Sequence, residues 1–260
     1  MMDANNAFTE KPWPALRDNL VDFLDLTKDK RFIYALSVAN VTTAKNDLER
    51  LTEQAEASFN INSYLLWSYG QVMGKHKDLH AIKHGKKLIV FDDIDIATVI
   101  ERELPDGTKQ PYPYIIRGVQ RRSYYEVAKE LEDAKTLDLD GLIARKKSVI
   151  LNRFPRWMRK IIMRKALKNP LKWKEALGTV AFTNIGSVVQ NKLFWPLPLG
   201  PYPVIVATGA VMEKQVADQT IWELNFCVCL DHNITDGAPA ARFGSDLIDF
   251  LEGGEGITMP

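Results

Sequence analysis

The sequence predicts an α+β fold in which helices flank a mixed, mostly antiparallel sheet. Apolar residues recur with the spacing of strands in some segments and of helices in others, without a strict strand–helix–strand repeat. Two long strand-like segments, 202–212 and 221–233, follow each other before a closing helix. With 260 residues, 46% of them apolar, the chain can bury a sizeable core.

The elements expected before residue 140 come from these patterns. Residues 60–76 start with polar capping residues and then become strongly apolar, as in a buried helix, and Ser123 with Glu126 forms a capping box. The expected helices are 44–57, 60–76 and 123–135. The expected strands are 31–43, one bent or two short strands in 86–102, and 112–118.

The second half continues with a strand that runs into a glycine turn at 177–188 and with the two long strands. A helix at 236–253 closes the chain, and Pro239 falls in its first turn, where a missing N–H costs little. We therefore expect an N-terminal arm at 1–15 and a single domain at 16–260.

Charge is distributed unevenly along the chain. The net charge is +1, yet residues 141–174 hold twelve Lys and Arg and no Asp or Glu, which leaves −11 on the rest. We interpret 141–174 as a basic insert in an acidic body, and the acidic body argues against nucleic-acid binding.

Within the insert, 153–174 has helical spacing, with Trp157, Met158, Ile161 and Ile162 on one side and Arg159, Lys160, Arg164 and Lys165 largely elsewhere. Such a helix could lie on an anionic membrane surface. Alternatively, it could pack on its own domain or on a neighbouring subunit, and both alternatives stay open.

The cysteines, the N-terminal sequence and the histidines indicate the cellular compartment and whether a metal is bound. Two cysteines, Cys227 and Cys229, alternate in one expected strand as core thiols, which favours a reducing compartment. Neither a signal-peptide core nor a membrane-spanning stretch is visible, so we expect a cytoplasmic protein, with peripheral attachment to a membrane as an open alternative. His76, His80 and His84 are spaced by four, but Gly85 and a following strand indicate a helix end with solvated histidines, and no metal is expected.

His232 ends the strand-like stretch "NFCVCLDHN" and follows Phe226, Val228 and Leu230 on the face of an apolar row. Partial desolvation there would favour the neutral imidazole, which a general base needs near pH 7. Asp236 and Gly237 follow at the corner before the last helix. On spacing alone, a structural histidine with ordinary turn and cap chemistry is the favoured alternative.

The stretch "DHNITDGAPAARF" resembles the signature of the dihydrolipoyl acyltransferase catalytic domain, Asp-His-Arg-x-x-Asp-Gly-Ala, whose fold is shared by the chloramphenicol acetyltransferase family. "GTVAFTNIGSV" resembles the Gly-Thr-x-x-x-Ser-Asn-x-Gly turn of that family, and "YPYIIRGVQRRSYYEVAKEL" its Val-Pro-x-Ile strand and helix. "YPVIVATGAV" is similar to the strand leading away from the substrate tunnel.

The resemblance implies a chloramphenicol-acetyltransferase-like fold and a coenzyme A-dependent acyltransferase. His232 would take the proton of the attacking thiol, of coenzyme A or of a dihydrolipoyl group, and Thr183 would donate to the oxyanion. Asp236 would be a strut paired with an arginine, for which Arg17 is the candidate, and Gly237 would support the turn. The family forms trimers, with His232 from one subunit and Thr183 from the next, and trimers build larger cages.

Three departures separate the chain from the dihydrolipoyl type. Asn233 replaces the arginine after the histidine, the basic insert is longer than the usual loop, and no lipoyl-lysine motif or lipoyl domain is present. A free-standing relative with a separate lipoyl-bearing partner is therefore expected. Two other functions stay open: a non-catalytic scaffold for a trimer-based assembly, and an acetyltransferase acting on a small alcohol or amine.

Overall fold

The computed structural model describes residues 8–54, 59–103, 107, 109–136, 155–189 and 192–257. Residues 1–7 of the expected arm and 141–154 of the expected basic insert lie outside this part of the chain.

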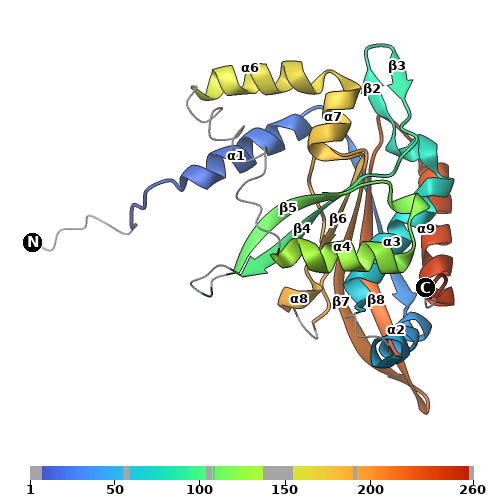
Figure 1. Cartoon of the computed structure of the whole chain (residues 1–260). Helices are drawn as coiled ribbons and strands as arrows, with labels where there is room; N and C mark the ends of the chain where they lie inside the picture. Colours follow the sequence, from blue (N-terminus) through green and yellow to red (C-terminus); the bar gives the residue numbers. More distant parts are fainter. Residues whose placement is uncertain are drawn as a thin grey trace, which may run out of the picture.

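The centre of the fold is a six-stranded sheet with the order β1-β8-β7-β6-β4-β5 (Figure 1). Its pairs β1/β8, β8/β7 and β4/β5 are antiparallel, whereas β7/β6 and β6/β4 are parallel. The mixed, mostly antiparallel sheet predicted from the sequence is thereby confirmed. Its strands are β1 (Phe32–Asn40), β4 (Ile96–Glu103), β5 (Lys109–Ile116), β6 (Val180–Asn184), β7 (Val204–Val216) and β8 (Gln219–Asp231).

Four helices cover one face of the sheet: α2 (Thr42–Gln54), α3 (Ile61–Lys75), α4 (Tyr124–Thr136) and α9 (Gly237–Gly253). The main core lies between them and the sheet, because the row Phe226, Val228 and Leu230 of β8 is fully buried there. Burial of this row confirms the strand pattern from which His232 was predicted to extend. Asn60 caps α3, and Ser123 with Glu126 forms the expected capping box before α4.

The other face is only partly covered. A small cluster around Tyr202 and Cys229 packs against Phe23 and Leu177, from the helices α1 (Ala15–Leu24) and α7 (Pro170–Leu177). The rest of this face leaves large apolar side chains exposed to solvent, namely Tyr34, Leu36 and Val38 of β1 and Val99 of β4. We call these four residues the open face. Apolar patches of this kind mark interaction sites.

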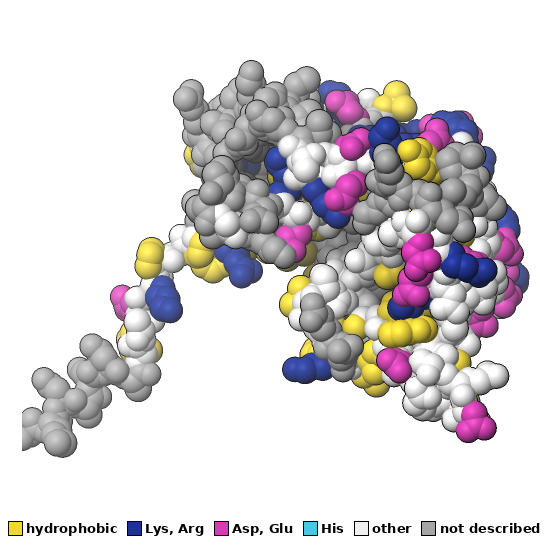
Figure 2. Space-filling view, turned by 60° about the horizontal axis from the view of Figure 1, so that its bottom comes forward, with side chains coloured by type: hydrophobic (Ala, Val, Ile, Leu, Met, Phe, Trp, Pro, Cys, Tyr) yellow, Lys and Arg dark blue, Asp and Glu magenta, His cyan; other side chains and the backbone are white. Residues whose placement is uncertain are grey.

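Several smaller elements complete the structure: η1 (Asp25–Thr27), η2 (Lys77–His80), η3 (Val119–Arg121), α6 (Arg156–Leu167), α8 (Gly186–Val189) and the hairpin β2 (Ile82–His84) with β3 (Lys87–Ile89). Residues 8–14, which precede α1, stand out from the body, as the space-filling view also shows (Figure 2). Within the described residues, no helix is both long and apolar enough to cross a membrane.

The three spaced histidines do not share a helix, since α3 ends at Lys75. The expectation that all three are solvated is wrong for His80, which is fully buried beside Phe91. Burial lowers the pKa of His80 to about 4, so the ring is neutral near pH 7. The described residues hold no group of three or more potential metal ligands.

The described part of the basic insert is two helices, α6 and α7, with Asn169 capping the second and Pro170 in its first turn. The predicted separation is wrong for Arg164 and Lys165, which are exposed on the same side of α6 as Trp157 and Ile161. Arg159 is buried and pairs with Asp22 of α1 at 3.0 Å, and Lys160 pairs with Asp25, whereas Trp157 and Ile161 point to solvent.

Candidate active site

His232 lies one residue beyond the end of β8, where its backbone N–H donates to the carbonyl of Arg31 at 2.6 Å. Its ring atom Nδ1 lies 2.8 Å from the carbonyl oxygen of Thr235. A carbonyl only accepts, so Nδ1 carries the proton and the lone pair of the neutral ring is on Nε2. No described residue makes a hydrogen bond to Nε2. The imidazole is therefore held by one nitrogen and offers the other as a base.

The expected desolvation of His232 is not provided by its own chain. The side chain is 46% exposed, because the strand has ended and no described helix of the same chain covers the ring. A neighbouring chain or a substrate would have to supply the low-dielectric surroundings.

Asp236 directly precedes α9 and is 91% exposed. Its Oδ1 lies 3.9 Å from Nδ1 of His232, which is too long for a hydrogen bond. Arg17 is exposed on α1, and within the described residues no ion pair joins it to Asp236. The pair expected from the resemblance is thus not formed within one chain. Gly237 does not have a positive φ, and a Cβ there would meet no described atom within 4 Å, so the backbone does not itself require glycine.

The buried carboxylate at this strand end belongs to Asp231. Its Oδ2 forms an ion pair with Nζ of Lys30 at 2.8 Å. Asn233 donates through Nδ2 to Asp231 Oδ1 at 2.8 Å and to the carbonyl of Asp29 at 2.9 Å. The residue that departs from the family signature is therefore a brace for the loop that carries His232. The loop geometry does not depend on an arginine at this position.

Thr183 lies near the end of β6, and its side chain is on the same face of the sheet as Ala181 of the small cluster and the open face. Among the described residues its hydroxyl has no hydrogen-bond partner, so it is available as a donor. The turn that follows is tight: Asn184 Oδ1 accepts from the N–H of Gly186 at 2.6 Å. A Cβ on Gly186 would lie 2.5 Å from the carbonyl oxygen of Gly209, so only glycine fits against β7 here.

Thr183 and His232 do not meet within one chain. Thr183 is opposite Ala207 of β7, and Ala207 is opposite Cys227 of β8. His232 follows Cys227 by five residues. At about 3.3 Å per residue and about 4.8 Å between strands, the two side chains are about 20 Å apart. One chain therefore holds the imidazole of His232 at one place and the hydroxyl of Thr183 at another.

A feature not predicted from the sequence is Asn225, on the same face of β8 as Cys227. Asn225 is 3% exposed, and neither atom of its amide has a hydrogen-bond partner in the described part of the chain. The amide lies over Gly209, where an added Cβ would come within 2.5 Å of Nδ2. An orphaned buried amide is costly, so the position calls for a partner from outside the described residues. The alternation of Asn225 with two buried cysteines was the available signal.

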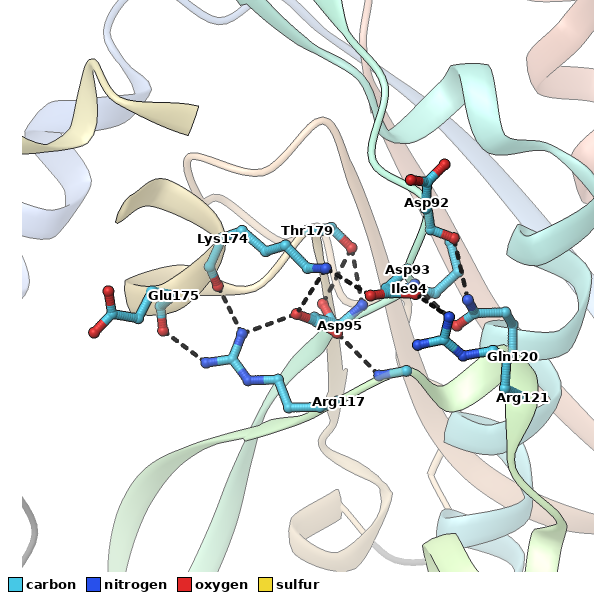
Figure 3. A network of polar contacts seen from close by, with 11 residues as sticks. Asp92, Asp93, Ile94, Asp95, Arg117, Gln120, Arg121, Lys174, Glu175 and Thr179 are labelled. Carbon is cyan, nitrogen blue, oxygen red and sulfur yellow. Dashed lines mark hydrogen bonds and ion pairs between the residues drawn. The ribbon is translucent and has the colours of Figure 1, made fainter. Parts of the chain in front are cut away.

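A second polar cluster lies where β4 begins and β5 ends (Figure 3). The buried Asp95 accepts from Arg117 at 2.9 Å and from the N–H of Gly118 at 2.9 Å, and Lys174 of α7 pairs with Asp93 at 2.9 Å. These residues line a hollow of about 330 Å³. Each charged group named here has a partner inside the network, so the cluster anchors α7 to the sheet. Gly178, with φ of 76°, lets the chain pass close to the carbonyl of Asp95, which an added Cβ would approach to 2.7 Å.

Both cysteines are buried and free, as expected for core thiols. Burial raises the pKa of Cys227 to about 11 and that of Cys229 to about 12. Thiols that stay protonated are poor nucleophiles, so neither is a candidate for covalent catalysis.

No family model and no curated protein matches the sequence. Solved structures do share the fold. The cubic core of the pyruvate dehydrogenase multienzyme complex is 16% identical over 100% of this chain and 98% of that chain, with a TM-score of 0.68. Dihydrolipoamide acetyltransferase of Azotobacter vinelandii, studied for the catalytic role of a serine, a histidine and an asparagine, is 17% identical over 97% and 94%, with a TM-score of 0.67.

Chloramphenicol acetyltransferase is 12% identical over 95% of this chain and 99% of that chain, with a TM-score of 0.51. The chain has the chloramphenicol-acetyltransferase-like fold that the sequence motifs predicted.

Proposed function

We propose that the protein is a coenzyme A-dependent acyltransferase that moves an acyl group between coenzyme A and a thiol such as dihydrolipoamide. The observation that carries the proposal is the bond between His232 Nδ1 and the Thr235 carbonyl, which leaves Nε2 as a free base at an exposed strand end. Spacing supports it. The asparagine studied in the Azotobacter vinelandii enzyme follows the histidine by 4 residues, and the serine precedes it by 52. Asp236 follows His232 by 4, and Thr183 precedes it by 49.

The reaction proceeds by general-base catalysis. Nε2 of His232 takes the proton from the acceptor thiol, whose pKa is about 8.5 in solution, and the sulfur attacks the thioester carbonyl of the acyl-coenzyme A. The hydroxyl of Thr183 donates to the oxyanion of the tetrahedral intermediate. When the intermediate collapses, the bond from the carbonyl carbon to the coenzyme A sulfur breaks, and the imidazolium returns the proton to the leaving thiolate.

The site is completed by a second chain in a trimer. Because His232 and Thr183 are about 20 Å apart in one chain, each site takes the histidine of one subunit and the threonine of the next. The open face supports this arrangement, since its four exposed apolar side chains lie on the same face of the sheet as Thr183 and need a cover. The neighbour would also enclose His232, which is half exposed in the single chain. Larger trimer-based assemblies, like the cubic core that shares the fold, fit the same interface.

The substrates are thiols on amide-bearing arms. The orphaned amide of Asn225 lies about 12 Å from Thr183, two residues along β8 and two strands across the sheet. Its one donor group and one acceptor match the amide groups in the arm of coenzyme A and in dihydrolipoamide. The sequence has no lipoyl-lysine motif, so the dihydrolipoyl group would be carried by a separate protein.

A panel of acyl-coenzyme A donors assayed for thiol release tests this function, with dihydrolipoamide, small alcohols and amines as acceptors. We expect activity with a thiol acceptor that falls about a thousandfold in His232→Ala. His84→Ala, which removes an exposed histidine on the distant hairpin β2/β3, is the matched control and should retain full activity.

The outcome also separates the alternatives. A folded wild-type protein that is inactive with every pair would favour the scaffold, and preference for an alcohol or amine would favour the small-molecule acetyltransferase. Activity that survives His232→Ala would remove the base from the mechanism.

A further inference from the structure

Helix α6 packs with Arg159 inward and with Met158, Met163, Ala166 and Leu167 partly buried. The guanidinium of Arg159 is buried and lies 3.0 Å from Asp22 Oδ2, and Lys160 binds Asp25. These ion pairs join α6 to α1 and η1, and Figure 1 shows α6 above α1 in the upper part of the view. The opposite side carries Trp157 and Ile161, which are 65% and 57% exposed. In surface helices large apolar side chains normally face the core, so the exposure of Trp157 and Ile161 calls for an explanation.

Basic side chains continue the same exposed stripe. Residues 157, 161, 164, 165 and 168 fall on one side of a helix by its period. Arg164, Lys165 and Lys168 are exposed there, and α7 adds the exposed Leu171 and Lys172. No Asp or Glu occurs between residues 155 and 174. We call these seven residues the outer face: Trp157, Ile161, Arg164, Lys165, Lys168, Leu171 and Lys172.

The composition of the outer face decides which partner it suits. The centres of protein–protein interfaces are poor in lysine, and here lysines alternate with the apolar side chains. Tryptophan and aliphatic residues mixed with Lys and Arg are typical of helices that lie in the headgroup region of a membrane. The positive charge complements anionic lipid. We propose that the outer face binds the surface of an anionic lipid bilayer, with Trp157 and Ile161 entering the headgroup layer.

The packing of α6 suits a peripheral attachment. The described helices are not long and apolar enough to span a bilayer, so α6 would lie in the plane of the surface. Arg159 is already paired with Asp22 of α1 and Lys160 with Asp25 of η1, which leaves the outer face to the lipid without loosening the helix from the body. Binding would place the acyltransferase body against a membrane.

Flotation of the whole protein with vesicles tests the proposal. We expect binding to vesicles of phosphatidylcholine and phosphatidylglycerol in equal parts, and little binding to pure phosphatidylcholine. The charge variant replaces Arg164, Lys165 and Lys168 by serine and spares the pairs with α1 and η1. It should bind on the order of a hundredfold more weakly. A matched control loses three exposed lysines of the hairpin β2/β3, Lys83, Lys86 and Lys87, and should bind like the wild type.

A second variant tests the apolar part: Trp157→Ser with Ile161→Ser should lose binding while circular dichroism and acyltransferase activity stay unchanged. Three results would overturn the proposal: wild type that does not float with anionic vesicles, charge and control variants that bind equally, or equal binding to neutral vesicles. A change of oligomeric state in the Trp157→Ser, Ile161→Ser variant, with lipid binding intact, would instead assign the outer face to a second copy of the chain.

Discussion

Nδ1 of His232 lies 2.8 Å from the carbonyl oxygen of Thr235, and this one contact sets the chemistry available to the ring. It fixes the proton on Nδ1 and the orientation of the imidazole in a loop that is braced by Asn233. The lone pair of Nε2 then points away from its own loop. In the proposed mechanism the imidazole is thus oriented by a backbone carbonyl, and not by the carboxylate of Asp236.

The tautomer is directly observable. In long-range ¹⁵N–¹H spectra near pH 8, the neutral ring of His232 should be protonated at Nδ1, with the signal assigned by its loss in His232→Ala. A neutral ring protonated at Nε2 would mean that the nitrogen needed as a base is occupied.

The hydroxyl of Thr183 should stabilise the transition state and contribute little to substrate binding. Thr183→Val keeps the shape of the side chain but removes its hydroxyl, so we expect kcat to fall by about 10²-fold with little change in KM. Thr183→Ser restores the donor and should recover most of the rate. Equal losses in the valine and serine variants would point to packing instead of oxyanion stabilisation.

The contact between Asp25 of η1 and Lys160 of α6 should weaken in acid. Side-chain bonds from Lys160 and Lys28 lower the pKa of Asp25 from 3.8 to about 2. A lowered folded-state pKa stabilises the contact fully above pH 4, and this stabilisation is lost as the pH falls from about 4 to 2. Hydrogen exchange of α6 should therefore rise in that range. In Lys160→Met, the rise in hydrogen exchange of α6 between pH 4 and 2 should be smaller than in the wild type. An unchanged pH profile in this variant would contradict the role of the Lys160–Asp25 pair.

The thiols of Cys227 and Cys229 should not react with thiol reagents in the native protein. Because burial raises the pKa of Cys227 to about 11 and that of Cys229 to about 12, a disulfide reagent at pH 8 should react with neither until the protein is unfolded. Denaturant should then release two thiols per chain. Rapid labelling of the folded protein would show that the sheet opens at β8. The same result decides whether thiol release can be read directly in the acyltransferase assay.

Local patterns were enough to predict much of this structure. The period of two in β8 and the capping box at Ser123 are encoded by residues close in sequence, and both are present. The motif around His232 and the glycine turn after Thr183 are equally local, and together they predicted the fold.

What could not be predicted depends on contacts between distant segments. The inward side of α6 is set by Arg159 and Asp22, which are far apart in the chain, and helical periodicity alone favours burial of the apolar side. The burial of His80 and the orphaned amide of Asn225 also depend on tertiary packing. Similarly, the separation of His232 from Thr183 follows from strand order, which the sequence does not state.

The central claim is that one site uses His232 of one chain and Thr183 of another. Co-expression of His232→Ala and Thr183→Val chains under different tags, followed by isolation of mixed trimers, tests it most directly. Each variant alone should be almost inactive. Mixed trimers should regain about a third of the wild-type activity, because one of their three interfaces joins an intact histidine to an intact threonine. Mixed trimers as inactive as the parents would contradict the shared site.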